Sequence, residues 1–79
     1  MTARAQQEIE AWLKKAIAKS LVMDEKQIDP SRPFAEFGID SVAAVELSGD
    51  LEEWLVKKIA PTVVWDYPTI TSLAAHLAG

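Results

Sequence analysis

Apolar side chains recur at helical spacing in three separate stretches of this chain of 79 residues. In the first stretch they follow the i, i+3, i+4, i+7, i+8 pattern that places side chains on one face of an α-helix. They belong to Ile9, Trp12, Leu13, Ala16 and Ile17. We therefore expect a helix over residues 4–20. The sequence shows no alternation of apolar and polar residues of the kind typical of a strand, and this favours an all-α fold.

A second helix is expected over residues 41–56. Asp40 or Ser41 can cap its start by accepting hydrogen bonds from free backbone N–H groups. Lys57 and Lys58 would close it, because the helix dipole favours cations at that end. One face carries the expected core residues, which are Ala44, Leu47, Ser48, Leu51, Trp54 and Leu55. The other side carries Val42, Val45, Glu46, Gly49 and Glu53.

Residues 22–40, between these two helices, predict a long loop. Their prolines, Asp29 and Gly38 interrupt the helical period and favour turns. Loops of this length are usually functional or are pinned by their own side chains. The candidate pins are Ile28, Phe34, Phe37 and Ile39.

Two further helices are expected near the end of the chain. Pro61 suits the first turn of a short helix over residues 61–66, where its missing N–H is not needed. Thr69 can cap a last helix, whose apolar residues are Ile70, Leu73, Ala74 and Leu77. The expected fold is a small four-helix bundle with three longer helices and a short third one. We expect it to form a single domain over residues 1–79.

The size and composition argue against several classes of function. On folding, a domain this small buries only about 60–65% of the surface that its unfolded chain exposes, which leaves no room for a deep active site beside the core. The chain has no cysteine and a single histidine, His76, so neither a metal site nor a set of catalytic residues is predicted. The net charge of −4 argues against nucleic-acid binding. No apolar run is long enough for an export signal or a membrane span, so we expect a cytoplasmic protein.

The acidic charge is concentrated in one segment. Residues 33–56 contain no basic side chain, whereas residues 1–20 carry four basic and two acidic ones. The acids of the segment are Glu36, Asp40, Glu46, Asp50, Glu52 and Glu53. With Val42 and Val45 on the side away from the core, the last four of these acids, Glu46, Asp50, Glu52 and Glu53, predict a recognition surface with an apolar centre and a charged rim. The common alternative is a solvated helix face without a partner.

A serine hydroxyl is expected at the start of the second helix, directly after an acid and a glycine turn. The hexapeptide at this point reads Phe37-Gly38-Ile39-Asp40-Ser41-Val42. Taken alone, it is also a common helix start, in which Ser or Asp is only a cap. It resembles the phosphopantetheine attachment motif of acyl and peptidyl carrier proteins, in which Gly, a variable residue, Asp and Ser are followed by Leu, Ile or Val.

The resemblance covers essentially the whole chain. Before the motif, the long loop ends in PFAEFG at residues 33–38, and the second helix carries Leu and Glu. After it, DYPTI at residues 66–70 and LAAHL at residues 73–77 are similar to the closing segment of the family. This ending is more similar to the carriers of polyketide synthases or peptide synthetases than to fatty-acid carriers.

The resemblance implies a role for each matching residue. Ser41 would take 4′-phosphopantetheine from coenzyme A on its hydroxyl, and Asp40 would be presented to the modifying transferase and its magnesium ion. Val42 and Val45 match positions that face partner enzymes, and Glu46 matches a charged position beside them. Glu53 is expected close enough to this surface to influence docking.

Gly49 departs from the larger apolar residue that is often found at its position in fatty-acid carriers. This departure argues against a partner surface of the fatty-acid type.

The implied function is that of a non-catalytic acyl carrier, which holds intermediates as thioesters in polyketide or related secondary-metabolite or fatty-acyl biosynthesis. The prosthetic arm would supply the thiol that a chain without cysteine lacks. The implied partners are a phosphopantetheinyl transferase, an adenylating enzyme or acyltransferase that loads the arm, and condensing enzymes; the chain itself is expected to be monomeric. The alternatives are a peptidyl carrier of a nonribosomal peptide synthetase and a helical docking module in which Ser41 only caps a helix.

The large aromatic residues and the histidine have structural interpretations. Trp12, Trp54 and Trp65 stand at spacings typical of packing residues. His76 is expected on the solvent side near the end of the last helix.

Overall fold

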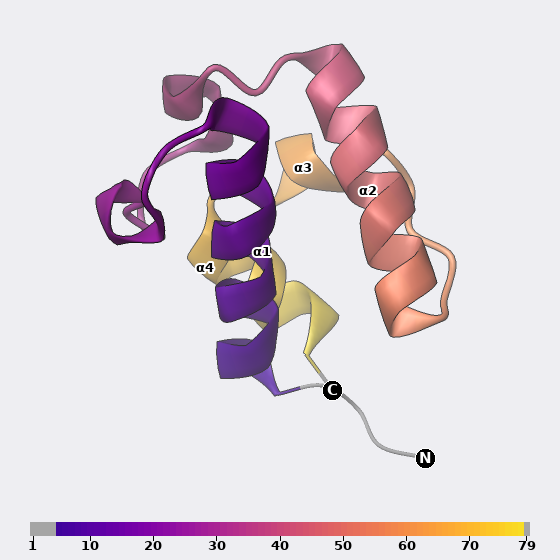
Figure 1. Ribbon diagram of the computed structural model, residues 1–79. Coiled ribbons are helices and arrows are strands. Elements are labelled where there is room, and N and C mark those ends of the chain that lie inside the picture. Colours follow the sequence, from indigo (N-terminus) through magenta and orange to yellow (C-terminus); the bar gives the residue numbers. More distant parts are fainter. Residues whose placement is uncertain (1–4, 79) are drawn as a thin grey trace.

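Four α-helices make up the computed structural model, which describes residues 5–78. They are α1 (Gln6–Leu21), α2 (Ser41–Leu55), α3 (Val63–Asp66) and α4 (Ile70–Leu77) (Figure 1). Two 3₁₀ turns, Glu25–Gln27 and Phe34–Phe37, lie in the loop between α1 and α2. No strand occurs within residues 5–78, and an isolated bridge joins Pro33 to Thr69. The expected all-α bundle is confirmed; Arg4, where the first helix was expected to begin, lies outside the described residues.

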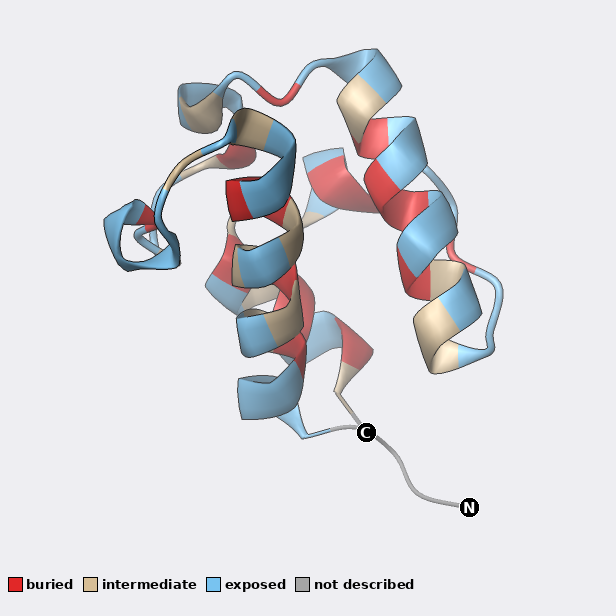
Figure 2. Cartoon of the chain, viewed as in Figure 1, coloured by how far each residue is buried: buried red, intermediate tan, exposed pale blue. Residues whose placement is uncertain are grey.

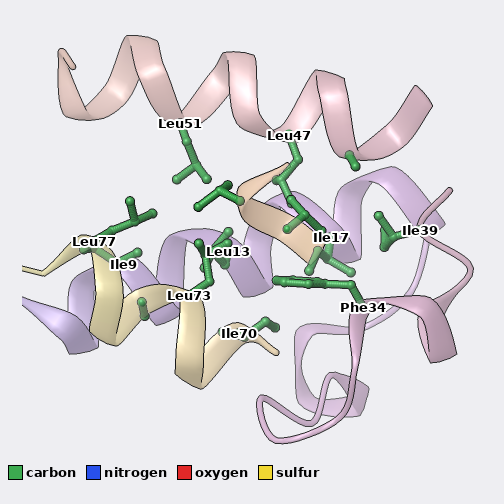
Figure 3. Packing of buried hydrophobic residues seen from close by; sticks show 14 of the residues in the cluster. Ile9, Leu13, Ile17, Phe34, Ile39, Leu47, Leu51, Ile70, Leu73 and Leu77 are labelled. Carbon is green, nitrogen blue, oxygen red and sulfur yellow. The ribbon is translucent and has the colours of Figure 1, made fainter. Parts of the chain in front are cut away.

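The core lies between α1, α2 and α4, as the apolar spacing predicts. Leu13 of α1, Leu51 of α2 and Leu73 of α4 point into it and are fully buried (Figure 3). Burying one such side chain contributes about 1.5–3 kcal/mol, so these contacts hold the long helices together. The same cluster includes Ile9, Ile17, Phe34, Leu47, Val64, Ile70 and Leu77.

The long loop is pinned as expected, and it is also tied to the end of the chain. Ile28, Phe34 and Ile39 are buried, and Phe37 is half-buried. The N–H of Phe34 donates to the carbonyl oxygen of Pro68 at 2.7 Å, and the N–H of Thr71 donates to that of Pro30 at 3.0 Å. These two bonds fix the loop against the segment between α3 and α4. They thereby hold the backbone that leads into α2.

The second helix spans the expected residues to within one position at its end. Val56 adopts a left-handed conformation with φ +54° and ends α2 at Leu55, so Lys57 and Lys58 lie beyond the helix instead of closing it. Val22 ends α1 in the same way, with φ +55°. A β-branched side chain is strained in this conformation, which glycine usually occupies at helix ends. Local helical spacing carries no sign of such an end.

The predicted start of the short third helix is wrong. The N–H of Val63 donates to the carbonyl oxygen of Ala60 at 3.0 Å, which closes a turn around Pro61 and Thr62. The helix α3 therefore begins at Val63, and Pro61 is outside its first turn.

Two of the three tryptophans pack as expected. The half-buried rings of Trp12 on α1 and Trp54 on α2 stack with their centroids 5.1 Å apart and their planes 9° apart. Trp65 does not fit the expectation, because it is 48% exposed. In the single turn of α3, Val63 and Val64 occupy the inward side, and this leaves Trp65 facing outward.

Candidate modification site

The start of α2 is capped by Asp40, which decides between the two caps that the sequence allows. A carboxylate oxygen of Asp40 accepts a hydrogen bond from the N–H of Ala43 at 2.9 Å, and its carbonyl oxygen accepts one from Ala44 at 2.8 Å. Ser41 is the first helical residue. Asp40 is therefore the N-cap of α2, and the Ser41 hydroxyl is not used for capping.

Ser41 is exposed, and within residues 5–78 its hydroxyl makes no hydrogen bond. Figure 1 shows the start of α2 at one end of the bundle, where the linking loop arrives. A free hydroxyl at the end of a rigid helix is accessible to the active site of another protein. This is the geometry required of a residue that is modified by an enzyme and not by its own chain.

Gly38 and Ile39 set the position of the helix start. Gly38 has φ +83°, a left-handed conformation that glycine adopts without strain, and it lets the chain turn out of the 3₁₀ turn. Ile39 is buried, and its N–H donates to the carbonyl oxygen of Phe34 at 3.3 Å. The backbone is thus anchored one residue before Asp40, while Asp40 and Ser41 stay exposed.

The site fits a phosphodiester on Ser41. The N–H groups of the first helical turn lack acceptors within the helix, and Asp40 satisfies that of Ala43. Those of Ser41 and Val42 remain directed at the helix end, where the dipole favours an anion. This chain would hold the group by one covalent bond and these backbone donors.

The side of α2 that is turned away from the core is open to solvent, as the helical wheel predicts (Figure 2). Val42 and Val45 are 66% and 53% exposed. Glu46, Gly49 and Glu53 are exposed as well. A glycine within a helix costs about 0.5–1 kcal/mol relative to alanine, so this face contains residues that do not serve stability.

The predicted core face of α2 holds over most of its length. Ala44, Leu47, Ser48 and Leu51 are buried, while Trp54 and Leu55 at its end are half-buried.

A groove of about 580 Å³ between α1 and α2 is a feature that sequence reasoning missed. Its lining includes Trp12, Lys15 and Lys19 on the α1 side and Ala43, Glu46 and Asp50 on the α2 side. No spacing along the chain predicts it, because it depends on how far apart the two helices pack.

His76 and the acidic side chains outside the start of α2 do not form a second candidate site in the described residues. His76 is exposed as expected, and its ring stacks on Tyr67 at 4.0 Å between centroids, a contact that the spacing does not reveal. In the described part of the chain, no three metal-binding side chains cluster. None of the helices within residues 5–78 is long and apolar enough to cross a bilayer.

Comparison with known proteins identifies the family. Residues 11–77 match the family model described as "Phosphopantetheine attachment site". A phenolphthiocerol/phthiocerol polyketide synthase protein of Mycobacterium tuberculosis is 37% identical over 71 residues, and a 6-methylsalicylic acid synthase of Penicillium terrestre is 33% identical over 64 residues. These matches cover 90% and 81% of this chain but only 4% of each relative.

Two solved structures are similar over almost their whole length. A free-standing peptidyl carrier protein from Acinetobacter baumannii has a TM-score of 0.88 and 37% identity, and the match covers 92% of this chain and 91% of that protein. An acyl carrier protein from Anabaena sp. PCC 7120, with a variant phosphopantetheinylation-site sequence, has a TM-score of 0.89 and 33% identity, with coverage of 99% and 89%.

The bundle and its exposed helix start thus define a carrier domain. The chain belongs to the phosphopantetheine attachment-site family, whose members bear 4′-phosphopantetheine covalently, and it is a carrier domain similar to segments of polyketide synthases and to free-standing carrier proteins.

Proposed function

We propose that Ser41 is the attachment residue and that this chain, as a single non-catalytic domain, carries acyl intermediates between the enzymes of a polyketide or related pathway. The observation that carries the proposal is the free, exposed Ser41 hydroxyl beside the Asp40 cap. When bound, the arm supplies a thiol that forms thioesters. Ser41 provides the point of attachment, and α2 keeps that point at the end of the bundle.

The exposed face of α2 is proposed as the docking surface for partner enzymes. Val42 and Val45 offer apolar contacts next to Ser41, and Glu46 and Glu53 supply negative charge beside them. A phosphopantetheinyl transferase, a loading enzyme and condensing enzymes would each approach this face in turn. Asp40 combines the cap with a carboxylate that the transferase and its magnesium can meet. A monomer in the cytoplasm suits this traffic, because the face has to be open to several enzymes.

A peptidyl carrier role is the second candidate, favoured by the structural match to the peptidyl carrier of A. baumannii. The two functions share the arm and differ in the enzyme that loads it. An adenylating enzyme would then load Ser41's arm with an aminoacyl group.

The test is intact-mass spectrometry after incubation with coenzyme A, magnesium and a broad-specificity phosphopantetheinyl transferase. We expect the wild-type protein to gain the mass of one arm and Ser41→Ala to gain none. Ser20→Ala removes another exposed serine, on α1, and should be modified like the wild type. Modification of Ser41→Ala would refute the assignment. An unmodified wild type with several transferases would favour the docking module.

Loading then separates the two carrier roles. The modified protein is offered to adenylating enzymes with amino acids, and in parallel to acyltransferases with acyl-coenzyme A substrates. An acyl-loaded species supports the acyl carrier, and an aminoacyl-loaded species alone supports the peptidyl carrier.

A further inference from the structure

Gly49 is a glycine that the fold does not require. A Cβ atom added there meets no heavy atom within 4 Å, so no close approach of another segment excludes a side chain. Its backbone is helical and does not have a positive φ angle. Among the glycines of the described residues, Gly38 is the one with a positive φ. Both structural reasons for a glycine are therefore missing. The helix thus lacks a side chain at an exposed position where one would fit.

The neighbours of Gly49 show what a missing side chain creates. Residues three or four apart, and seven apart, lie on one side of a helix, so Val42, Val45 and Gly49 share the outward side of α2. The two valines project from it and are more than half exposed. The helix therefore presents an apolar ridge near Ser41 that drops to bare backbone at Gly49.

The charges around Gly49 indicate the partner's chemistry. Glu46 precedes it by three residues, Asp50 follows it directly and Glu53 follows it by four, and all three are exposed. Residues 33–56 contain no Lys or Arg, but Lys15 and Lys19 of α1 line the groove that Glu46 and Asp50 also line, whereas Glu53 is not part of that lining. A group that enters at Gly49 meets bare helix backbone beside the exposed valines, with Glu46 and Glu53 about one helical turn away on either side along the helix. The complementary surface is an apolar side chain flanked by basic residues.

We propose that Gly49 is a specificity-determining contact, at which the phosphopantetheinyl transferase seats a projecting apolar side chain against the backbone of α2, with Lys or Arg beside Glu46 and Glu53. The proposal rests on the proposed docking role of α2. It adds that recognition needs a hollow at this position, so that larger residues reject such a partner. A bare backbone also lets the partner come closer to the helix than any side chain would.

The test compares two substitutions at Gly49 with a control on α1. Gly49→Leu fills the hollow, Gly49→Ala fills it in part, and Ala11→Leu adds the same leucine side chain to an exposed position of another helix. With a transferase that modifies the wild type, we expect Gly49→Leu to lower kcat/KM for modification about tenfold, mainly through KM, and Gly49→Ala to lower it less. Ala11→Leu should match the wild type.

Stability moves in the opposite direction. Gly49→Ala should raise the melting temperature by about 2–8 °C while it slows modification, since alanine favours the helix. A more stable but slower variant cannot be explained by loss of folding.

The outcomes separate this inference from the proposed function. If the wild type and both Gly49 variants are modified at equal rates, the hollow has no role, although Ser41 remains the attachment residue. Equal losses for Gly49→Leu and Ala11→Leu would also overturn the inference, because any added leucine would then interfere. If the wild type is not modified at all, both proposals fail.

Discussion

Alanine substitutions at the neighbouring residues Asp40 and Ser41 should differ in their effect on stability: the first lowers it and the second does not. The Asp40 carboxylate accepts the N–H of Ala43 at 2.9 Å, and replacing such a cap by alanine costs about 1 kcal/mol, within a range of about 0.5–2 kcal/mol. The Ser41 hydroxyl makes no hydrogen bond within residues 5–78, and alanine has the higher helix propensity. Ser41→Ala should therefore leave the free energy of unfolding unchanged or raise it by up to about 0.5 kcal/mol.

A third variant separates the cap of Asp40 from its charge. Asparagine caps a helix about as well as aspartate, so Asp40→Asn should be within a few tenths of a kcal/mol of the wild type. It lacks the carboxylate that we propose the transferase meets, so its modification should be slower. A wild-type rate for Asp40→Asn would limit this residue to the cap.

Urea unfolding followed by far-UV circular dichroism measures the three free energies. For a domain of this size, 1 kcal/mol corresponds to about 4–8 °C in melting temperature, so thermal melts give an independent value. A Ser41→Ala variant that loses as much stability as Asp40→Ala would refute the reasoning, because the hydroxyl would then be the cap.

Three further predictions concern the core, the charged face and pH. Leu51→Ala should lower the free energy of unfolding in urea by about 2–5 kcal/mol, because Leu51 is buried. Val42→Ala should lower it by less than about 0.5 kcal/mol, because Val42 is largely exposed. Equal losses would mean that the buried and exposed faces of α2 are reversed. Glu46→Lys should slow modification by a transferase with a basic docking surface, whereas Lys14→Glu should not. The difference should shrink as salt is added, because charges are screened over about 8 Å at physiological ionic strength. A Glu46→Lys rate equal to that of the wild type at low salt would exclude electrostatic steering. Hydrogen bonds from the Ser31 side chain and backbone hold the pKa of Asp29 below its usual value, so this carboxylate stabilises the fold above its unfolded pKa and loses that effect as the pH falls through the folded value. Unfolding free energies measured below about pH 4 should therefore fall more steeply for the wild type than for Asp29→Asn, and parallel curves would contradict this.

The helices could be predicted because their signal is local. Apolar spacing within α1, α2 and α4 identifies each helix and its buried face without knowledge of the rest of the chain. The position of Ser41 at a helix start follows from the same local signals, since Gly38 and Asp40 precede it directly. The sequence leaves open whether Asp40 or Ser41 is the cap, because both residue types serve in that position equally well.

The features that could not be predicted depend on contacts between distant residues. The left-handed Val56, the late start of α3 and the outward face of Trp65 are set by how the chain returns to the core after α2. The groove between α1 and α2 likewise depends on the packing distance of two helices. None of these has a periodic signal in the sequence.

The two bonds that tie Pro30 and Phe34 to Thr71 and Pro68 have a consequence for protein synthesis. The ribosome makes the loop and α2 before it makes the residues that fix them. An isolated helix of the length of α2, 15 residues, is only marginally stable in water. Ser41 therefore acquires its ordered helix start only when α4 has emerged and docked on α1. We expect the transferase to act on chains that include α4 and to leave chains that stop before α4 unmodified.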